Sequence, residues 1–570
     1  MEILQLKDVS FSYENSKNPV LQHVSLSIQE GKFHIICGKT GCGKTTLLRL
    51  LKQELMPFGQ LTGSILYRGG NLRELEPKKS AAEIGFVMQK PEQQIVTDKV
   101  WHELAFGLEN LGVPPEKIRR RVCEMASYFG ITQWFYQDVW ELSGGQKQLL
   151  NLASVMAMNP KVLLLDEPTS QLDPIAASEF LQTLKKLNRE FGLTIVMIEH
   201  HLEEIFPDAD QAVILENGRI LASGTPREVL GKINRRNEYM EAMPAAARLY
   251  YAFLEEQNNF KNCPLTIREG KDFVEQHFKN TIKGLPKQQE NLPIGEKVLE
   301  FCNVSFRYER NGKDVLSETS FQVREQEIFC ILGANGSGKT TTLKAASGLI
   351  KPYSGKINVL GRKIQSYKNG SLYKGILAML PQDVQNVFTR ETIAEEFMDV
   401  YGCHSSEELE ENLLENPVVQ TGILPLEDLY DKHPYDLSGG QQQICALMKV
   451  LCQKPKILLL DEPTKGIDAF AKRKLQKLLM MLKETMAIVI VTHDIEFSAE
   501  TADRCGLFFQ GKMVSDDTPE VFFSENTFYT TAANRMMRER YENIVTIKDA
   551  AAICRQNGWQ ERSGATHEKD

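Results

Sequence analysis

Long hydrophobic runs are missing from this sequence. No stretch among its 570 residues approaches the roughly 18 uninterrupted apolar residues that a membrane-spanning helix requires. The N-terminal string MEILQLKDVSF also lacks the basic start and the apolar core of a signal peptide. We therefore expect the chain to remain in the cytoplasm.

Cysteine pairs that could hold a metal or build a disulfide framework are missing as well. The 11 cysteines are an odd number and include no C-x-x-C pair, so we expect reduced thiols and no zinc-ligand spacing. Cys42 differs from the others because it lies inside a glycine-rich loop at the start of a predicted helix. It is either an exposed, reactive thiol or a side chain small enough to fit the loop.

Basic residues are not in excess. The 67 Lys and Arg residues face 75 Asp and Glu residues, which gives a formal net charge of −8. This balance argues against a protein that coats nucleic acid, although a local basic patch would be compatible with it. With 42% hydrophobic and 25% charged residues, the composition is that of a globular chain. The length predicts about four domains.

The sequence does contain a pair of glycine-rich loops. GKTGCGKTT begins at Gly38 and GANGSGKTT begins at Gly333, and both fit the pattern G-x-x-x-x-G-K-[ST]. In this pattern backbone N–H groups surround phosphate oxygens, the lysine reaches the terminal phosphates and the hydroxyl holds Mg²⁺. Buried strands are predicted before the loops at 33–37 and 327–332, and helices are predicted after them. Each loop therefore predicts a nucleotide site.

The loops belong to a repeat of the whole chain. Lys44 and Lys339 are 295 positions apart, and other strings recur at this distance or at two residues less. In the two tails, LTIREGKDF around Thr266 resembles VTIKDAAAI around Thr546, and each predicts a helix start with an acid three residues after the threonine. The other matched pairs are Tyr13 and Tyr308, Gln89 and Gln382, Leu142 and Leu437, Glu167 and Glu462, and His200 and His493.

Each half also carries an apolar strand that ends in two acids, VLLLDEP and ILLLDEP. Such strands suit a parallel sheet whose carboxyl ends face a ligand. Asp166 and Asp461 would support Mg²⁺, and Glu167 and Glu462 would polarise the water that attacks the γ-phosphate. A strand-end Asp-Glu pair alone could be a solvated turn, but both glutamates follow their loop lysine by 123 residues. This spacing favours the functional interpretation.

The string LSGGQ occurs at 142–146 and at 437–441. A serine and two glycines at a helix start form a second phosphate-binding end, and nothing in the same half is left for it to bind. A glycine-rich turn before an amphipathic helix would be the alternative. Together with the loops and the acids, each LSGGQ is predicted to serve the nucleotide of the other half.

The order of aromatic residue, phosphate loop, Gln, LSGGQ, LLLDEP and His resembles the ATP-binding-cassette ATPase family, twice over and across essentially the whole chain. The resemblance implies an α/β fold with two tandem P-loop domains. Each would have a parallel sheet core, an antiparallel β subdomain, a helical subdomain and a small C-terminal appendage. The predicted boundaries are 1–230 and 297–520 for the nucleotide-binding domains, 231–296 for the first appendage with a linker, and 521–570 for the second appendage.

The resemblance also implies that the two cassettes meet head to tail within the chain, so that each ATP lies between one phosphate loop and the other LSGGQ and no homodimer is required. Catalytic roles would fall to Glu167, Glu462, His200, His493, Gln89 and Gln382. Mg²⁺ would be held by Thr45, Gln89, Asp166, Thr340, Gln382 and Asp461. In the first half, ATP would be bound by Tyr13, Gly38, Lys39, Thr40, Gly41, Cys42, Gly43, Lys44, Thr45, Thr46, Ser143, Gly144, Gly145 and Gln146. In the second half, the corresponding residues are Tyr308, Gly333, Ala334, Asn335, Gly336, Ser337, Gly338, Lys339, Thr340, Thr341, Ser438, Gly439, Gly440 and Gln441.

The halves depart from the family pattern at two places. The first half has IEHH where the second has VTHD, which leaves His200 or His201 as the contact to the γ-phosphate, and the register favours His200. Lys465 stands in KGID where a small residue is more usual, a change that could make the sites unequal. Tyr13 and Tyr308 would stack on adenine, although an isolated strand-end tyrosine is more often a packing residue. Because both glutamates are present, we predict two hydrolytic sites.

Opening and closing of the two cassettes could act on one of three kinds of partner: membrane subunits of a transporter, the ribosome, or DNA. The segment VMQKPEQQIVTDKVWHELAFGLENLGVP and the string PLTIREG are similar to energy-coupling-factor importer ATPases. Translation-factor cassettes resemble one another in a charged helical insert that this chain lacks, and repair cassettes carry zinc-ligand cysteine spacings that are absent. Fused sugar-importer ATPases remain the closest rival, although they often carry one degraded site.

The favoured hypothesis is a peripheral ATPase on the cytoplasmic face of the cell membrane. Its partners would be an integral membrane coupling subunit and a substrate-binding membrane subunit, with no nucleic acid. Motion would pass through grooves near Gln89–Gln94 and Gln382–Gln385. The cargo would be a vitamin, a vitamin precursor or a metal ion. A duplicated ATPase resembles the branch linked to thiamine-precursor uptake.

Overall fold

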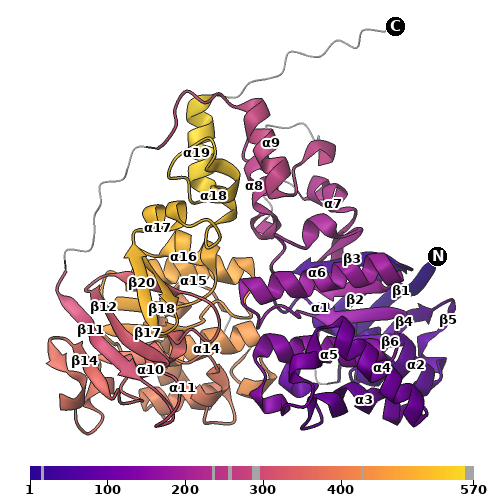
Figure 1. The fold of residues 1–570 in the computed structure, drawn as a ribbon, viewed down its shortest axis with the longest axis horizontal. Helices are drawn as coiled ribbons and strands as arrows, with labels where there is room; N and C mark the ends of the chain where they lie inside the picture. Colours follow the sequence, from indigo (N-terminus) through magenta and orange to yellow (C-terminus); the bar gives the residue numbers. More distant parts are fainter. Residues whose placement is uncertain (15–17, 234–237, 254–259, 286–294, 425–428, 559–570) are drawn as a thin grey trace. The chain divides into compact units, whose positions relative to one another are not determined.

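The computed structural model describes residues 1–14, 18–233, 238–253, 260–285, 295–424 and 429–558. The chain divides into two compact units (Figure 1). The first unit comprises Met1–Pro244 with Glu255–Thr266, and the second comprises Ala245–Leu254 with Ile267–Asp570.

The first unit opens with an antiparallel sheet of four strands. Its long first strand buries Leu4 and Leu6 before an irregularity, and Val9 and Phe11 after it, in the core beneath the sheet. The strands are β1 (Glu2–Tyr13), β2 (Leu21–Gln29), β4 (Gly59–Tyr67) and β5 (Gly70–Asn71), in the order β2-β1-β4-β5.

A six-stranded sheet forms the centre of the first unit. Its inner strands are buried on both faces, as their continuous apolar sequences predict for a parallel sheet. The strands are β3 (Phe33–Gly38), β6 (Ile84–Val87), β7 (Val162–Asp166), β8 (Thr194–Ile198), β9 (Gln211–Glu216) and β10 (Arg219–Gly224). Their order is β10-β9-β3-β8-β7-β6, and β10 runs antiparallel to β9 while the other neighbours pair parallel.

Helices cover this sheet, and a group of them forms a subdomain on one side of it. The first of them, α1 (Lys44–Leu50), packs between the two sheets, and a helical subdomain is built from α3 (Val100–Asn110), α4 (Pro115–Tyr128) and α5 (Gly144–Ala157). The Asp173 side chain accepts a hydrogen bond from the Ala176 N–H at the start of the next long helix, and Gly192 ends that helix in the left-handed conformation. The remaining helices are α2 (Pro77–Glu83), α6 (Pro174–Phe191) and α7 (Pro226–Lys232).

The second unit repeats this plan, which confirms the predicted α/β class. Its antiparallel sheet contains β11 (Lys297–Phe306), β12 (Leu316–Arg324), β14 (Ser354–Val359) and β15 (Arg362–Lys363), in the order β12-β11-β14-β15. Its six-stranded sheet contains β13 (Ile328–Leu332), β16 (Leu377–Leu380), β17 (Ile457–Asp461), β18 (Ala487–Val491), β19 (Arg504–Phe509) and β20 (Lys512–Asp517), in the order β16-β17-β18-β13-β19-β20.

The helices of the second unit follow the same order along the chain. Those that belong to the cassette are α10 (Lys339–Ala346), α11 (Ile393–Tyr401), α12 (Ser406–Leu414), α13 (Pro417–Gln420), α14 (Gly439–Leu451), α15 (Ala469–Leu482), α16 (Ile495–Thr501) and α17 (Pro519–Glu525). The predicted strands before the phosphate loops, and the predicted helices after them, are present in both units.

A cluster of four helices completes the second unit, and two of its members come from the tail of the first half. They are α8 (Ala245–Tyr251), α9 (Ile267–His277), α18 (Ala532–Met537) and α19 (Ile547–Asn557), which lie side by side in Figure 1. A Cβ on Gly270 of α9 would lie 2.4 Å from the Met536 sulfur and 3.0 Å from the Ala246 Cβ. The glycine therefore permits close contact of α9 with both neighbouring helices.

One buried amide joins the two tails of this cluster. The Asn557 Oδ1 accepts hydrogen bonds from the Thr281 N–H (3.0 Å), the Thr281 hydroxyl (3.1 Å) and the Ile282 N–H (2.9 Å), and its Nδ2 donates to the Ile282 carbonyl (2.9 Å). Nearby, the Tyr541 hydroxyl donates to the Lys279 carbonyl at 2.8 Å. Residues 279–282 are thus held by the C-terminal part of the chain. The domain boundaries drawn from the sequence stay predictions.

Candidate nucleotide sites

Each phosphate loop has a backbone that only glycine can adopt at two positions. Gly38 and Gly43 have φ of 154° and 101°, and Gly333 and Gly338 have φ of 155° and 108°. A Cβ on Gly38 would lie 2.2 Å from the Leu215 carbonyl oxygen, a distance that excludes any side chain. The two loops therefore share one geometry, that of a turn whose backbone N–H groups can bind phosphate oxygens.

The loop lysines are buried within these turns. Lys44 donates from Nζ to the carbonyl oxygens of Gly38 and Lys39, both at 2.9 Å. Lys339 does the same to Gly333 (2.7 Å) and Ala334 (3.0 Å). The ammonium groups are therefore held at the centre of each loop, where a phosphate would be bound.

A threonine and an aspartate meet beside each loop. The Thr45 hydroxyl donates to Asp166 Oδ1 at 3.1 Å, and the Thr340 hydroxyl donates to Asp461 Oδ1 at 3.1 Å. Burial, and then the neighbouring Glu167, raises the pKa of Asp166 to about 6, and burial raises the pKa of Asp461 to about 6 as well. Asp461 Oδ2 is buried and has no hydrogen-bond partner within the described residues. Buried oxygen donors of this kind fit Mg²⁺.

The predicted catalytic glutamates follow these aspartates in a strained turn. Glu167 and Glu462 have φ of 44° and 52°, a left-handed conformation that is uncommon for side chains other than glycine. The strands therefore end at Asp166 and Asp461, and the glutamates turn out of the sheet. Strain of this kind is concentrated at functional sites because the surrounding structure must hold it.

The first glutamate is held by two side chains from other segments. His200 Nε2 lies 2.8 Å from Glu167 Oε1, and Gln89 Nε2 donates to Glu167 Oε2 at 2.7 Å. Burial alone would raise the pKa of Glu167, but the His200 and Lys44 charges bring it below its usual range. The structure thus brings Gln89, Glu167 and His200 together, whereas His201 is exposed.

The second glutamate has a different arrangement. His493 Nδ1 lies 2.9 Å from Glu462 Oε2 as an ion pair without hydrogen-bond alignment, and the His493 N–H donates to the same oxygen at 3.4 Å. Burial opposes the ionisation of Glu462, but His493 keeps its pKa below the usual range. Gln382 is exposed, and no hydrogen bond from its side chain to Glu462 is found in the described part of the chain. Its catalytic role stays a prediction.

The two strand-end tyrosines also repeat. The Tyr13 hydroxyl lies 2.9 Å from Thr46 Oγ1 and the Tyr308 hydroxyl lies 3.2 Å from Thr341 Oγ1. Tyr13 is 37% exposed and Tyr308 is 61% exposed. Both rings are thus fixed at the phosphate loop with a face available, as adenine stacking requires.

Each LSGGQ begins a helix with a capping box. The Ser143 hydroxyl accepts from the Gln146 N–H (3.3 Å) and the Gln146 side chain accepts from the Ser143 N–H (2.9 Å). Ser438 and Gln441 form the same pair at 3.3 and 3.0 Å. These caps fix the glycines at the first turns of α5 and α14. Their part in binding ATP stays a prediction.

Residues outside the predicted set also touch the first phosphate loop. Lys39 forms an ion pair with Glu238, and its ammonium lies 5.7 Å from the centre of the Tyr239 ring. Both partners belong to the 3₁₀ segment Glu238–Ala242. Sequence reasoning missed them because they follow the phosphate loop by about 200 residues without a recurring string.

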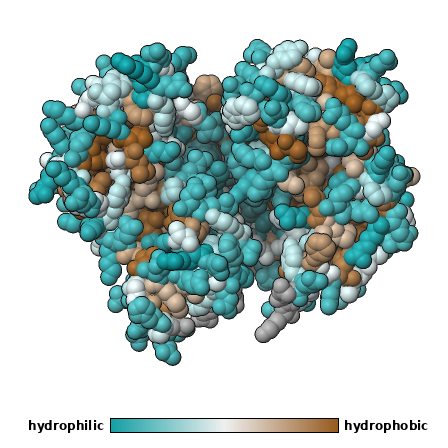
Figure 2. Space-filling model, turned by 90° about the horizontal axis from the view of Figure 1, so that it is seen from below, coloured by the Kyte–Doolittle hydropathy of each residue, from teal (hydrophilic) through white to brown (hydrophobic). Residues whose placement is uncertain are grey.

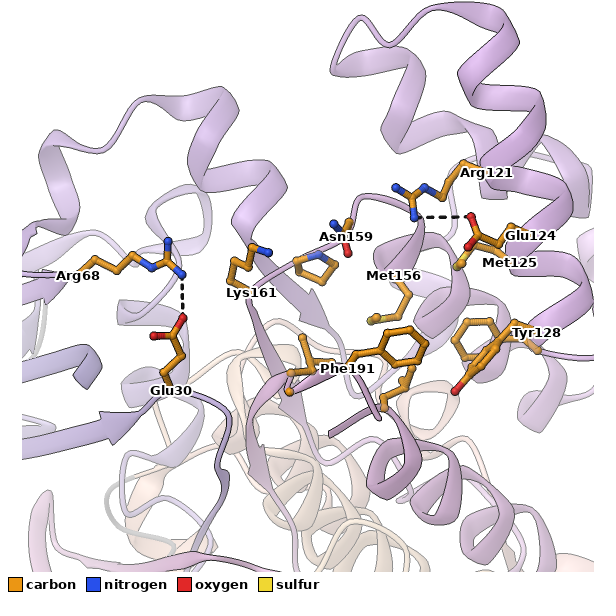
Figure 3. A pocket seen from close by; sticks show the side chains of 15 residues that line it. Glu30, Arg68, Arg121, Glu124, Met125, Tyr128, Met156, Asn159, Lys161 and Phe191 are labelled. Atoms are coloured by element: carbon orange, nitrogen blue, oxygen red, sulfur yellow. Dashed lines mark hydrogen bonds and ion pairs between the residues drawn. The ribbon is translucent and has the colours of Figure 1, made fainter. Parts of the chain in front are cut away.

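A separate cavity of about 310 Å³ lies in the first unit (Figure 3). It is lined by Asn159 and Lys161 before β7, by Gly192 before β8 and by Tyr128 of α4. These positions are at the amino ends of the strands, opposite to the carboxyl ends that hold Asp166 and Glu167. The cavity is therefore not part of the nucleotide site.

No helix in the described ranges is long and apolar enough to cross a membrane. The sequence profile of the family described as ABC transporter matches residues 21–170 and 316–465. A protein of Bacillus thuringiensis subsp. konkukian, provisionally named an ABC transporter ATP-binding protein, is 39% identical over 96% of this chain and 98% of its own length. A Bacillus subtilis protein, provisionally named HMP/thiamine import ATP-binding protein YkoD, is 31% identical over 97% of this chain and 98% of its own length.

A solved structure of CbiO1 from Clostridium perfringens, described as part of the ABC transporter complex CbiONQ, is 30% identical and covers 41% of this chain and 95% of that chain, with a TM-score of 0.37. The profile and the full-length relatives agree with the two sets of nucleotide-binding groups in the structure. The chain belongs to the ABC transporter family, as an ATPase that carries two nucleotide-binding domains.

Proposed function

We propose that this ATPase is the energy-supplying subunit of an energy-coupling-factor type importer. It acts at the cytoplasmic face of the membrane and drives uptake of a vitamin, a vitamin precursor or a metal ion through separate membrane subunits. The two cassettes close head to tail, so that each ATP lies between the phosphate loop of one half and the LSGGQ of the other. The repeated geometry of loops, glutamates and LSGGQ helices supports two such sites.

In each site the residues of this chain bind and orient the reactants. Lys44 and the surrounding N–H groups bind the phosphates, and Glu167 accepts a hydrogen bond from the attacking water and aligns it with the γ-phosphate. His200 and Lys44 keep the Glu167 carboxylate ionised, and the Gln89 side chain holds it in place. When bound, Mg²⁺ neutralises phosphate charge, and Thr45 and Asp166 would hold it.

The importer assignment depends mainly on an exposed apolar surface of the first unit, which we call the aromatic ridge. It comprises Val96 (65% exposed), Trp101 (41%), Tyr136 (79%) and Trp140 (66%). Backbone hydrogen bonds from Trp101 to Phe135 (3.2 Å) and from Val139 to Asp98 (2.8 Å) hold its two segments together. Figure 2 shows that the face seen from below in Figure 1 carries separate apolar patches among hydrophilic side chains.

The second half repeats the ridge at only one of these four positions, where Tyr435 is 56% exposed. The positions that correspond to Val96, Trp101, Tyr136 and Trp140 are Thr389, Ala394, Asp431 and Tyr435. The scaffold itself is repeated, because Glu103 accepts from the N–H groups of Val96 and Thr97, and Glu396 accepts from those of Thr389 and Arg390. Three exposed aromatics on a rigid support in one half, against one at the matching positions of the other, suit one asymmetric membrane subunit that presents an apolar helix.

The test is to tag the full chain in its native cell, solubilise membranes in mild detergent and identify co-purifying proteins by mass spectrometry. Multi-pass membrane proteins are expected with the unaltered chain. Replacing Tyr136 and Trp140 by serine is expected to reduce their recovery by about 10-fold or more, because exposed aromatics dominate such interfaces. Phe58→Ser is the matched control, since Phe58 is 88% exposed but lies outside the ridge.

Recovery of ribosomal proteins without a membrane partner would overturn the importer proposal and leave the ATPase assignment intact. Unchanged recovery of membrane proteins with the ridge variant would remove the ridge as their contact. Of the membrane proteins recovered, the substrate-binding subunit would identify the cargo, because it is the one that binds it. The relative named for HMP/thiamine import makes a thiamine precursor the first compound to test.

A further inference from the structure

The residue before the site histidine differs between the two halves. The first half has Glu199 before His200, at the end of β8, and the second half has Thr492 before His493, at the end of β18. Glu199 is 1% exposed and Thr492 is fully buried. A fully buried acid is rare unless neighbouring groups bind it, so its partners indicate its role.

Glu199 binds the backbone of the histidine loop. Its Oε1 accepts hydrogen bonds from the N–H of His200 at 3.2 Å and from the N–H of His201 at 3.5 Å. The titratable groups that face it are Glu167 and His200, and the Thr169 hydroxyl lies beside it. Burial and then Glu167 raise the pKa of Glu199 to about 7, while His200 and the Thr169 hydroxyl oppose the rise.

In the second half, where a threonine replaces this acid, the histidine is held differently. The Thr492 hydroxyl accepts from the Asp494 N–H at 3.0 Å and does not bind the N–H of His493. That N–H donates to Glu462 instead, and the ring approaches Glu462 through Nδ1. In the first half the N–H of His200 is bound by Glu199, and the ring reaches Glu167 through Nε2 at 2.8 Å.

We propose that Glu199 is a positioning residue of the first ATP site, which holds the His200–His201 backbone so that His200 meets Glu167 through Nε2. This inference depends on the proposed roles of Glu167 and His200 in hydrolysis. It makes the two ATP sites unequal, because the matching position of the second half is a threonine that binds elsewhere. Glu199 acts through His200 and does not touch the nucleotide.

The experiment uses the full chain with Glu462→Gln, so that turnover reports the first site. We compare kcat and KM for ATP between pH 5.5 and 9 in this parent and after adding Glu199→Thr or Glu199→Gln. Glu199→Thr is expected to lower kcat by about 10- to 100-fold with KM nearly unchanged, because misplacement of a group that acts in the transition state affects turnover. Glu199→Gln keeps an oxygen acceptor for the His200 and His201 N–H groups and is therefore expected to retain most of kcat.

Glu204→Gln is the matched control, because Glu204 is an exposed acid of the same loop, and its kcat and pH profile should equal those of the parent. Hydrogen exchange gives a second measurement that does not need activity: the His200 and His201 amides should exchange faster in Glu199→Thr. Unchanged kcat in Glu199→Thr, or unchanged exchange of both amides, would overturn the inference. A parent without ATPase activity would instead refute independent hydrolysis at the first site, on which the kinetic test depends, and the exchange experiment would then decide the role of Glu199 alone.

Discussion

His200 contacts Glu167 through Nε2 at 2.8 Å, within a turn where Glu167 has φ of 44°. A carboxylate held in this way can orient a water without rearranging. We expect Glu167→Gln and Glu462→Gln each to lower steady-state ATP hydrolysis, and the double variant to lower it by about 100-fold or more. Rates are measured by phosphate release at saturating Mg²⁺ and ATP.

The control for these variants is ATP binding, which should stay close to that of the unaltered chain because glutamine preserves the shape of the side chain. Full wild-type turnover in either single variant would contradict the prediction of two hydrolytic sites.

Tyr13 and its hydrogen bond to Thr46 predict a graded effect on nucleotide affinity. Tyr13→Ala is expected to weaken ATP binding at the first site by about 10-fold, because stacking of a base on an aromatic ring contributes about 1–3 kcal/mol. Tyr13→Phe keeps the ring and should bind nearly as well. Binding is measured by calorimetry in the double glutamine background, with Tyr136→Ala as the exposed-tyrosine control. Equal affinity of Tyr13→Ala and Tyr13→Phe would identify Tyr13 as a packing residue.

His34 predicts an acid-dependent loss of stability. It is 2% exposed, and burial lowers its pKa from 6.5 to about 4, although the nearby Asp210 opposes part of this shift. The Gln29 N–H donates to Nε2, a hydrogen bond that only the neutral ring can accept. Between these two values the unfolded chain binds a proton that the native chain does not. The folded state therefore loses stability as pH falls from 6.5 toward 4, by up to about 3 kcal/mol.

This loss should be absent in His34→Gln, which keeps an acceptor for the Gln29 N–H but does not titrate. Urea unfolding of the first unit between pH 4.5 and 7.5 gives the difference between the two chains at each pH. His404→Gln, at an exposed histidine, should show no such trend. If the unfolding free energies of the unaltered chain and of His34→Gln differ by the same amount at every pH, His34 is not buried in its neutral form.

Asn557 predicts a stability effect in the helix cluster. Asn557→Ala removes one side chain that makes four hydrogen bonds to Thr281 and Ile282 and leaves buried N–H groups without acceptors. The expected cost is about 2–4 kcal/mol of unfolding free energy in the second unit. Asn526→Ala is the control, since Asn526 donates within its own turn, to the Phe522 carbonyl at 2.7 Å. Equal effects of both variants on the unfolding midpoint would contradict this role of Asn557.

Much of the fold was predictable because its signals are local. The strings VLLLD and ILLLD are strands in both units and end at the predicted aspartates. The predicted helix start at Thr546 is confirmed by a capping box with Asp549, and α9 begins directly after Thr266. These features follow from short-range patterns that the sequence displays directly.

Features set by long-range packing could not be predicted. The sequence shows Glu199 as one of several acids near a histidine, and only the fold shows that it is buried and bound to two N–H groups. Gln89 and Gln382 occupy matching positions, yet only Gln89 reaches its glutamate among the described residues. Likewise, α9 resembles α19 in sequence, but nothing in either string reveals that both join one cluster.

The shared helix cluster determines which fragments of this protein can fold with their apolar surfaces covered. A fragment that stops before the second phosphate loop would keep α8 and α9 but lose α18 and α19, which cover them. Buried side chains such as Leu249 and Phe273 would then face solvent, and such surfaces favour aggregation or pairing with a second copy. Half-molecules for crystallography or calorimetry should therefore be supplied with the complementary C-terminal helices as a separate peptide.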